Sequence, residues 1–107
     1  MSVKSIIQRK LAHLDVEKAV GYYVDTSNLT AAMGFVAALE TAYAHISRNP
    51  ATGSSRYAFE TNLPGLRSWP LTKYPYLIFY VDLDRHIDVW RVLHMAIDIP
   101  NWLASEG

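Results

Sequence analysis

The 107-residue chain contains no cysteine. This absence excludes disulfide bonds, thiolate nucleophiles and cysteine-ligated zinc. The chain also has no net charge, because its ten Lys and Arg residues balance its ten Asp and Glu residues. A balanced chain lacks the positive field that non-specific nucleic-acid binding uses. We therefore expect no direct sequence-specific binding of nucleic acid.

Long apolar runs and the usual enzyme signatures are missing as well. No run approaches the roughly 18 residues of a membrane span, and residues 1–14 lack the continuous apolar segment of a signal peptide. The four histidines do not have HExxH spacing, and neither a Gly-rich phosphate loop nor a GxSxG turn occurs. We therefore expect a cytoplasmic chain with no metal, no cofactor and no membrane contact.

What remains is the composition of a folded domain. Half of the residues are hydrophobic and 19% are charged, so the chain has enough apolar surface to form a core. Its length is that of one compact unit. We predict a single domain over residues 1–107.

The first half of the chain has helical periodicity. Apolar residues between Ala12 and Asp25, and again from Leu29 to Ile46, recur every three or four positions. The turn and capping residues at 26–28 separate the two segments, and Asn49-Pro50 ends the second one. The short connection predicts an antiparallel helical hairpin.

The second half changes to short aromatic and β-branched runs separated by Pro and Gly. Four strands are predicted at residues 3–7, 66–71, 76–81 and 86–93, with a weak additional strand at 56–60, and a tail follows at 98–103. Pro70 predicts an edge or a bulge, and the last two strands read as a hairpin. We predict an α+β fold in which a helical hairpin packs on a small antiparallel sheet, in the order β-α-α-β-β-β with a short C-terminal tail.

Two arginines are the main charged candidates. Arg91 lies inside an apolar strand and needs a partner, for which Asp88, Asp98 or a carbonyl are available. The other interpretation of Arg91 is an anion-binding or partner-binding group on an open sheet face. Arg67 shares a strand face with Trp69, so the two side chains are predicted either to present a flat charged surface or to form a solvated pair.

The remaining polar groups favour structural roles. His94 ends a strand and is either a general acid or base or a hydrogen-bonded structural residue. His13 and His45 are predicted to be surface groups on helices. The carboxylate pairs Asp15/Glu17 and Asp82/Asp84 do not have the spacing of an acid–base dyad or of a calcium loop. Trp102, near the chain end, is predicted either to fold back on the sheet or to contact a partner.

Five segments in order resemble one family. They are Arg48-Asn-Pro-Ala-Thr-Gly53, Leu63-Pro-Gly-Leu-Arg-Ser-Trp-Pro70, Tyr76-Leu-Ile-Phe-Tyr80, Val89-Trp-Arg-Val-Leu-His94 and Asp98-Ile-Pro100. Together they cover nearly the whole chain and look like the ParE branch of the RelE/ParE toxins. The residues that carry the family motifs are Leu66, Arg67, Trp69, Pro70, Arg91, His94, Asp98 and Pro100.

The resemblance implies the toxin of a type II toxin–antitoxin system, neutralised by a ParD-like antitoxin in a hetero-oligomer. The ParE branch poisons DNA gyrase and blocks replication without being an enzyme. An amphipathic antitoxin helix is expected on the helical hairpin and an extended segment along the sheet. Tyr22 and Trp102 are the expected partner anchors.

The resemblance leaves two alternatives. A RelE-like, ribosome-dependent endoribonuclease would use Arg67, Lys73, Arg91 and His94. The cations that such enzymes carry are replaced, however, by Tyr76 and by the apolar residues 95–97, and ParE relatives commonly have arginine at the position of Ile97. That loss weakens the stabilisation of phosphate charge. The second alternative is a non-toxic relative that only binds a partner.

Overall fold

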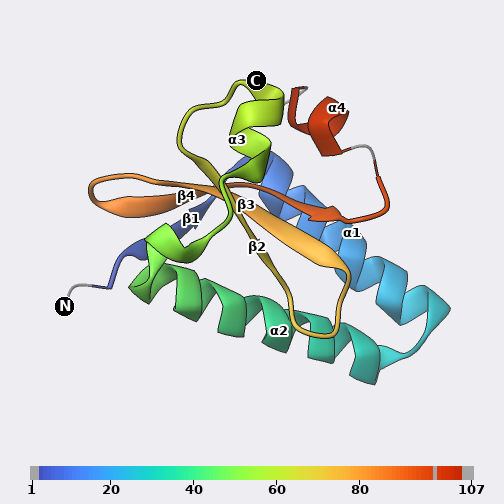
Figure 1. Cartoon of the computed structure of the whole chain (residues 1–107). Coiled ribbons are helices and arrows are strands. Elements are labelled where there is room, and N and C mark those ends of the chain that lie inside the picture. The colour runs from blue at the N-terminus through green and yellow to red at the C-terminus, as the bar shows by residue number, and fades with distance from the viewer. Residues whose placement is uncertain (1–2, 98, 105–107) are drawn as a thin grey trace.

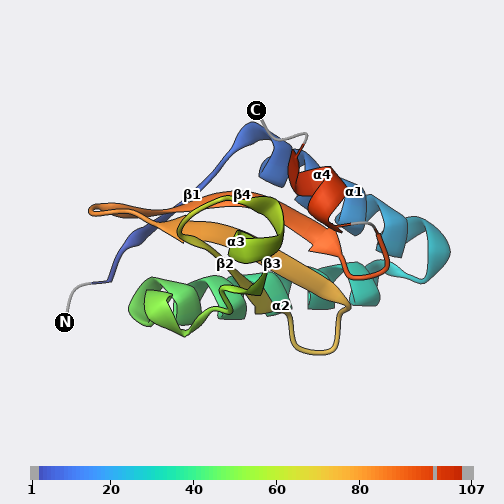
Figure 2. The ribbon, with the colours of Figure 1, turned by 45° about the horizontal axis from the view of Figure 1, so that its top comes forward.

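Two long helices cover one face of a four-stranded sheet, and two short helices lie over the other face (Figure 1; Figure 2). The structure is a computed structural model that describes residues 3–97 and 99–104. The α+β class, the helical hairpin on the sheet and the predicted order of strands and helices are confirmed. Two short helices are added to this order, one before the second strand and one after the last strand.

The helical hairpin consists of α1 (Lys10–Thr26) and α2 (Leu29–Arg48). The side chain of Asn28 caps α2 by accepting a hydrogen bond from the Ala31 N–H at 2.8 Å. The apolar stripe of α2 turns Phe35, Leu39 and Ile46 into the core. The predicted antiparallel hairpin therefore follows directly from the helical spacing and the short turn.

The sheet has the strand order β1-β4-β3-β2. Its strands are β1 (Ser5–Gln8), β2 (Leu66–Pro70), β3 (Tyr76–Asp82) and β4 (His86–His94). The three later strands pair antiparallel, as predicted. In the pairing of β3 with β4 the register shifts at Phe79/Tyr80 and skips Trp90. Such a bulge increases the local twist of the sheet.

One strand departs from the predicted antiparallel arrangement, because β1 runs parallel to β4. The helical hairpin returns the chain to the start of β1, where the Lys4 N–H donates to the Ser47 carbonyl at 3.3 Å. The sheet is therefore mixed. Alternation of apolar residues does not encode strand direction, which the return path of the two helices decides.

The predicted strand at residues 56–60 is wrong: this segment is helix α3 (Arg56–Thr61), preceded by the short 3₁₀ turn η1 (Pro50–Thr52). In a strand Tyr57 and Phe59 would share a face. Instead, Tyr57 packs edge-on against Phe79, while Phe59 is 86% exposed. Asn62, in the left-handed conformation, ends α3.

The C-terminal tail folds back as α4 (Ile99–Ala104). Ile99 and Leu103, four positions apart, are both buried beside Phe79 and Leu93. This cluster closes the sheet face opposite the helical hairpin. The tail thus folds back on the sheet through these two side chains, whereas Trp102, for which both interpretations were open, is 40% exposed.

Helix α2 is long and apolar enough, judged by length and composition alone, to cross a membrane. Its inner side, however, forms the centre of the larger core cluster with the sheet. A core helix of a folded domain passes the same test. Its outer side carries the exposed apolar residues Leu29, Met33 and Val36.

Candidate functional site

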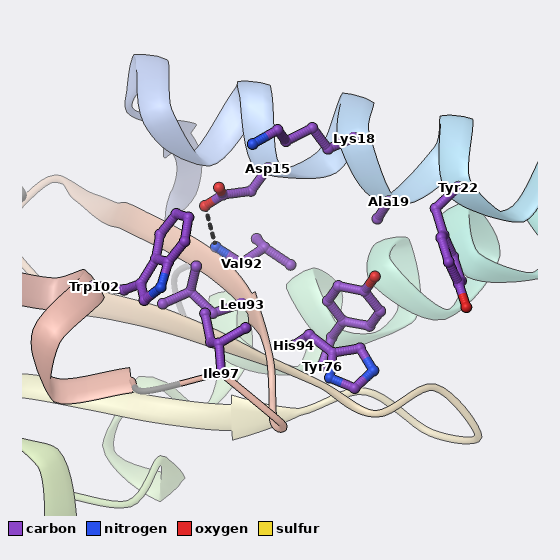
Figure 3. A pocket seen from close by; sticks show the side chains of 10 residues that line it. All are labelled: Asp15, Lys18, Ala19, Tyr22, Tyr76, Val92, Leu93, His94, Ile97 and Trp102. Carbon is purple, nitrogen blue, oxygen red and sulfur yellow. Dashed lines mark hydrogen bonds between the residues drawn. The ribbon is translucent and has the colours of Figure 1, made fainter.

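A cleft of about 380 Å³ opens between α1 and the end of β4 (Figure 3). Lys18 and Tyr22 line it from α1, Tyr76 from β3, His94 from β4 and Trp102 from α4. Residues from these four elements meet here only because the sheet brings the start of β3 beside the end of β4. Of the predicted site residues, Tyr22, His94 and Trp102 line this cleft.

Two of the rings that line the cleft contact each other. Tyr76 and His94 are register partners, and their ring centroids lie 5.1 Å apart at 75°. His94 Nδ1 accepts a hydrogen bond from the Ala96 N–H at 3.0 Å, so the neutral ring carries its proton on Nε2. Burial, and then the nearby Tyr23 and Tyr22, raise the pKa of Tyr76. Tyr76 therefore stays a neutral phenol at physiological pH.

Arg91 lies next to the cleft and is held by a buried ion pair. Its Nε and Nη2 atoms donate to the two carboxylate oxygens of Asp15 at 2.7 and 2.8 Å. The other end of the guanidinium lies 3.4 Å from the Trp102 carbonyl. Asp15 also accepts from the Val92 N–H at 3.0 Å, so it covers the edge of β4 beyond the end of β1.

The predicted partners of Arg91 need correction. The paired interpretation is confirmed, and the carbonyl candidate is present, but the carboxylate is Asp15 on α1 and not Asp88. Asp88 instead binds Arg9, whose Nη2 lies 3.0 Å from it. Asp98 lies outside the described residues. Because Arg91 is 3% exposed, it is not an open anion-binding group.

Arg67 and Trp69 share a strand face, as predicted, but they have different partners. Arg67 donates to the Gly53 carbonyl at 2.8 Å. Trp69 stacks on His45, with ring centroids 4.1 Å apart and planes 18° from parallel. His45 also lies 2.9 Å from the Thr52 hydroxyl. His45 is therefore half-buried, because α2 places it against β2, whereas His13 is exposed.

The four residues of the ribonuclease alternative do not converge. His94 lines the cleft, Arg91 borders a hollow beside α1, Lys73 lies on the β2–β3 turn, and Arg67 borders a hollow beside α3. The four side chains therefore lie in different parts of the molecule and do not form one site.

The other motif residues have structural roles, in the core or at the ends of strands and helices. Leu66 is 1% exposed and packs in the cluster with Phe79. Pro70 ends the edge strand β2, where a missing N–H costs no ladder bond, as predicted. Pro100 lies in the first turn of α4. These positions specify the fold more directly than they specify chemistry.

The edge of β2 is already occupied. Ser54 exchanges two backbone hydrogen bonds with Ser68, both of 2.9 Å, and the Leu66 N–H donates to the Leu63 carbonyl at 3.2 Å. With Pro70 at the end, β2 has few backbone groups left for an added strand. The expected extended antitoxin segment therefore has little to pair with at this edge.

Both expected partner anchors line the cleft. Tyr22 is 55% exposed on α1, and Trp102 is 40% exposed on α4. The Trp102 ring also lies 5.3 Å from the Arg91 guanidinium carbon, measured to the ring centroid. Their placement agrees with an anchoring role, which stays a prediction.

Sequence reasoning missed a second groove, of about 850 Å³, between α2 and the β2–β3 turn. Tyr74 holds this turn against the helix by donating to the Ala31 carbonyl at 2.8 Å. The small residues on this flank of α2 are the signal that was available, since Ala31, Gly34, Ala38 and Thr41 follow helical spacing.

Among the described residues, no group of three His, Asp or Glu side chains is arranged to hold a metal ion. The four residues of the ribonuclease alternative also lie apart from one another. What the cleft offers is the ring pair of Tyr76 and His94, one lysine and the two exposed aromatic side chains of Tyr22 and Trp102. Such a surface is suited to contact with another macromolecule.

Comparison with known proteins finds one matching family and a similar solved structure. The family model described as "ParE toxin of type II toxin-antitoxin system, parDE" matches residues 6–99. Among solved structures, one described as the chromosomal ParDE TA system from P. aeruginosa superimposes with a TM-score of 0.71 at 17% identity, over 86% of this chain and 96% of that chain. No curated protein matches in sequence.

Proposed function

The chain belongs to the ParE toxin family of type II toxin–antitoxin systems, and from that membership we propose that it binds DNA gyrase, blocks replication and is neutralised by a ParD-like antitoxin. In this proposal it acts in the cytoplasm by binding, without catalysing a reaction. The family match over residues 6–99 is the observation that carries the proposal.

The distribution of cations supports binding rather than catalysis. A phosphate-cleaving site needs positive groups aimed at the charge that develops in the transition state. Arg91 is instead buried against Asp15, and Arg67 is engaged by the Gly53 carbonyl. Both cations thus hold the fold together.

The test is a supercoiling and cleavage-complex assay with purified gyrase and the purified chain. The proposal predicts loss of supercoiling and accumulation of cleaved DNA as the toxin concentration rises. Normal gyrase activity at saturating toxin contradicts it. Growth arrest on induction, relieved by co-expression of the antitoxin from the neighbouring reading frame, tests the toxin–antitoxin part. Absence of arrest favours the non-toxic relative.

The ribonuclease alternative retains one favourable observation, because Lys18, Tyr76 and His94 do line one cleft. Primer extension on translated messages after induction separates it from gyrase inhibition. Discrete codon-linked cuts that disappear in His94→Ala would favour the nuclease. His94 is a better probe than Arg91, whose removal leaves Asp15 unpaired in the interior.

A further inference from the structure

We propose that α3 is the surface through which a second copy of this chain binds, so that Phe59 of each copy enters the hollow beside α3 of the other copy. This hollow, of about 470 Å³, lies between α3 and the turn at residues 62–66. It belongs to the sheet face opposite the helical hairpin (Figure 2). The inference goes beyond the proposed function, because it requires neither gyrase nor antitoxin.

Phe59 is the most exposed large apolar side chain among the described residues, at 86%. The fold itself does not depend on it, because Tyr57 and Ala58 already attach α3 to the cluster around Phe79. Burial of a phenyl ring is among the larger single contributions that one side chain makes to an interface. Phe59 is therefore available as an anchor for a partner.

The hollow beside α3 is a suitable receptor for the same side chain. Ala58, Pro64 and Leu66 line it, and Arg67 borders it. A phenyl ring in this hollow contacts apolar side chains and lies near a guanidinium, which is attracted to an aromatic face. The Leu63 N–H donates to the Ala58 carbonyl at 3.1 Å, and the Leu66 N–H donates to the Leu63 carbonyl at 3.2 Å. These bonds fix the wall of the hollow before a partner arrives, which lowers the entropic cost of binding.

The anchor and its receptor are neighbours on one surface, because Phe59 also lines the rim of the hollow. Such a surface is self-complementary. A two-fold axis beside α3 brings each Phe59 to the hollow of the other copy, as in an isologous dimer. A different partner would have to supply both an aromatic side chain and a matching hollow.

The charges of α3 are self-complementary as well. Arg56 and Glu60 lie one helical turn apart, with their Nε and Oε1 atoms at 3.3 Å and both side chains exposed. Two copies of α3 that pack antiparallel about the axis bring Arg56 of one copy to Glu60 of the other. Within the described residues, the terminal nitrogens of Arg56 have no hydrogen-bond partner, so they can donate to this second carboxylate. A partner of one charge sign would instead meet a like charge at one end of α3.

The first experiment measures the molar mass of the purified chain by sedimentation equilibrium between about 1 µM and about 1 mM, without gyrase or antitoxin. We expect the wild type to show a monomer–dimer equilibrium. Phe59→Asp should raise the dimer dissociation constant by roughly 30-fold or more. The matched control is Leu29→Asp, which replaces a side chain that is 66% exposed at the start of α2 and should dimerise like the wild type. Thermal unfolding shows that both variants are folded.

Charge reversal tests the antiparallel contact between the two copies. Arg56→Glu and Glu60→Arg each place like charges at both ends of α3, so each variant alone should have a dissociation constant raised by roughly 10-fold. An equimolar mixture of the two variants should form dimers again, because an acidic α3 then meets a basic one. A role of this ion pair within one chain predicts no such rescue, since neither variant regains the pair.

Three outcomes overturn the inference. The first is a wild-type chain that stays monomeric up to about 1 mM. The second is a dimer that Phe59→Asp leaves intact, or that Leu29→Asp dissociates, because the contact then lies elsewhere. The third is a monomeric wild type whose inhibition of gyrase is lost in Phe59→Asp, since gyrase and not a second copy would then cover the hollow. A chain that dimerises as expected but leaves gyrase active contradicts the proposed function alone.

Discussion

The two faces of the sheet are closed by different means. On one face, two long helices bury a continuous apolar and aromatic cluster that includes Phe35, Ile78 and Tyr80. On the other face, the six-residue helices α3 and α4 cover a smaller cluster around Phe79 and Leu93. The hairpin face is stabilised by the burial of a large apolar area, and this hydrophobic effect is non-directional. The opposite face adds a specific polar contact, because Arg91 reaches both α1 and α4.

Because of this difference, the hairpin face determines the stability of the whole domain, whereas the contacts on the opposite face determine whether α4 stays attached. The hairpin face buries most of the core, so substitutions there should affect the unfolding of the whole domain. The α4 side depends on a few contacts near the chain end, so its loss can be local. The candidate cleft lies between these two parts of the molecule, because Lys18 lines it from α1 of the hairpin and Trp102 lines it from α4.

The largest expected effect comes from breaking the Arg91–Asp15 pair. Arg91→Met leaves Asp15 charged and unpaired in the interior, which should lower the free energy of unfolding by about 3–5 kcal/mol. The double variant Asp15→Asn/Arg91→Met removes both charges and keeps an acceptor for the Val92 N–H. Denaturant unfolding should show it to be more stable than Arg91→Met alone. A double variant as unstable as the sum of the single variants would contradict this account.

A matched pair of leucines compares the two faces directly. Leu39→Ala in α2 and Leu103→Ala in α4 remove the same buried atoms and should each cost about 2–5 kcal/mol where the contact is made. We expect Leu39→Ala to lower protection of the whole sheet in hydrogen exchange. Leu103→Ala should release mainly α4. Equal loss across the sheet in both variants would remove the distinction between the faces.

Two glycines sharpen the comparison within the hairpin face. Gly21 in α1 has open space where a Cβ would lie, so Gly21→Ala should stabilise the domain by about 0.5–1 kcal/mol. Gly34 in α2 faces the Tyr74 hydroxyl, so Gly34→Ala should destabilise it by about 1 kcal/mol. Thermal melting of both variants measures the sign. Two shifts of the same sign would show that the turn is not held tightly against α2.

The smallest effect concerns alkaline pH. Burial raises the pKa of Tyr23, Tyr43, Tyr76 and Tyr80, all of them on the hairpin face. The unfolded chain therefore loses these protons first as the pH rises above about 10, and the free energy of unfolding falls from there. Unfolding at several pH values should show a shallower fall in Tyr43→Phe than in the wild type. An identical slope would mean that Tyr43 ionises equally in both states.

Much of the fold could be predicted because local sequence patterns specify its helices and strands. The period of the apolar residues identified both long helices, and the β-branched runs identified all four strands of the sheet. The strand predicted at residues 56–60 is wrong because five residues are too few to separate a helical from an alternating pattern. There Tyr57 packs on Phe79, and this tertiary contact decides the local structure.

The site was less predictable than the fold. The need of Arg91 for a partner followed from its apolar strand, but Asp15 lies far away in sequence, and only the packing of α1 on β4 brings it there. The stacking of His45 on Trp69 and the groove along α2 have the same origin. These features join elements whose relative placement no local pattern specifies.

By itself, the sequence determined the class of fold, the family resemblance and the absence of cysteine chemistry, because these depend on composition, period and motif order. Tertiary structure alone decided the parallel direction of β1, the partner of each arginine and the convergence of Tyr76, His94 and Trp102 on one cleft. The physical reason is that side-chain contacts across elements depend on how helices return the chain to the sheet. That path is set by packing over the whole domain.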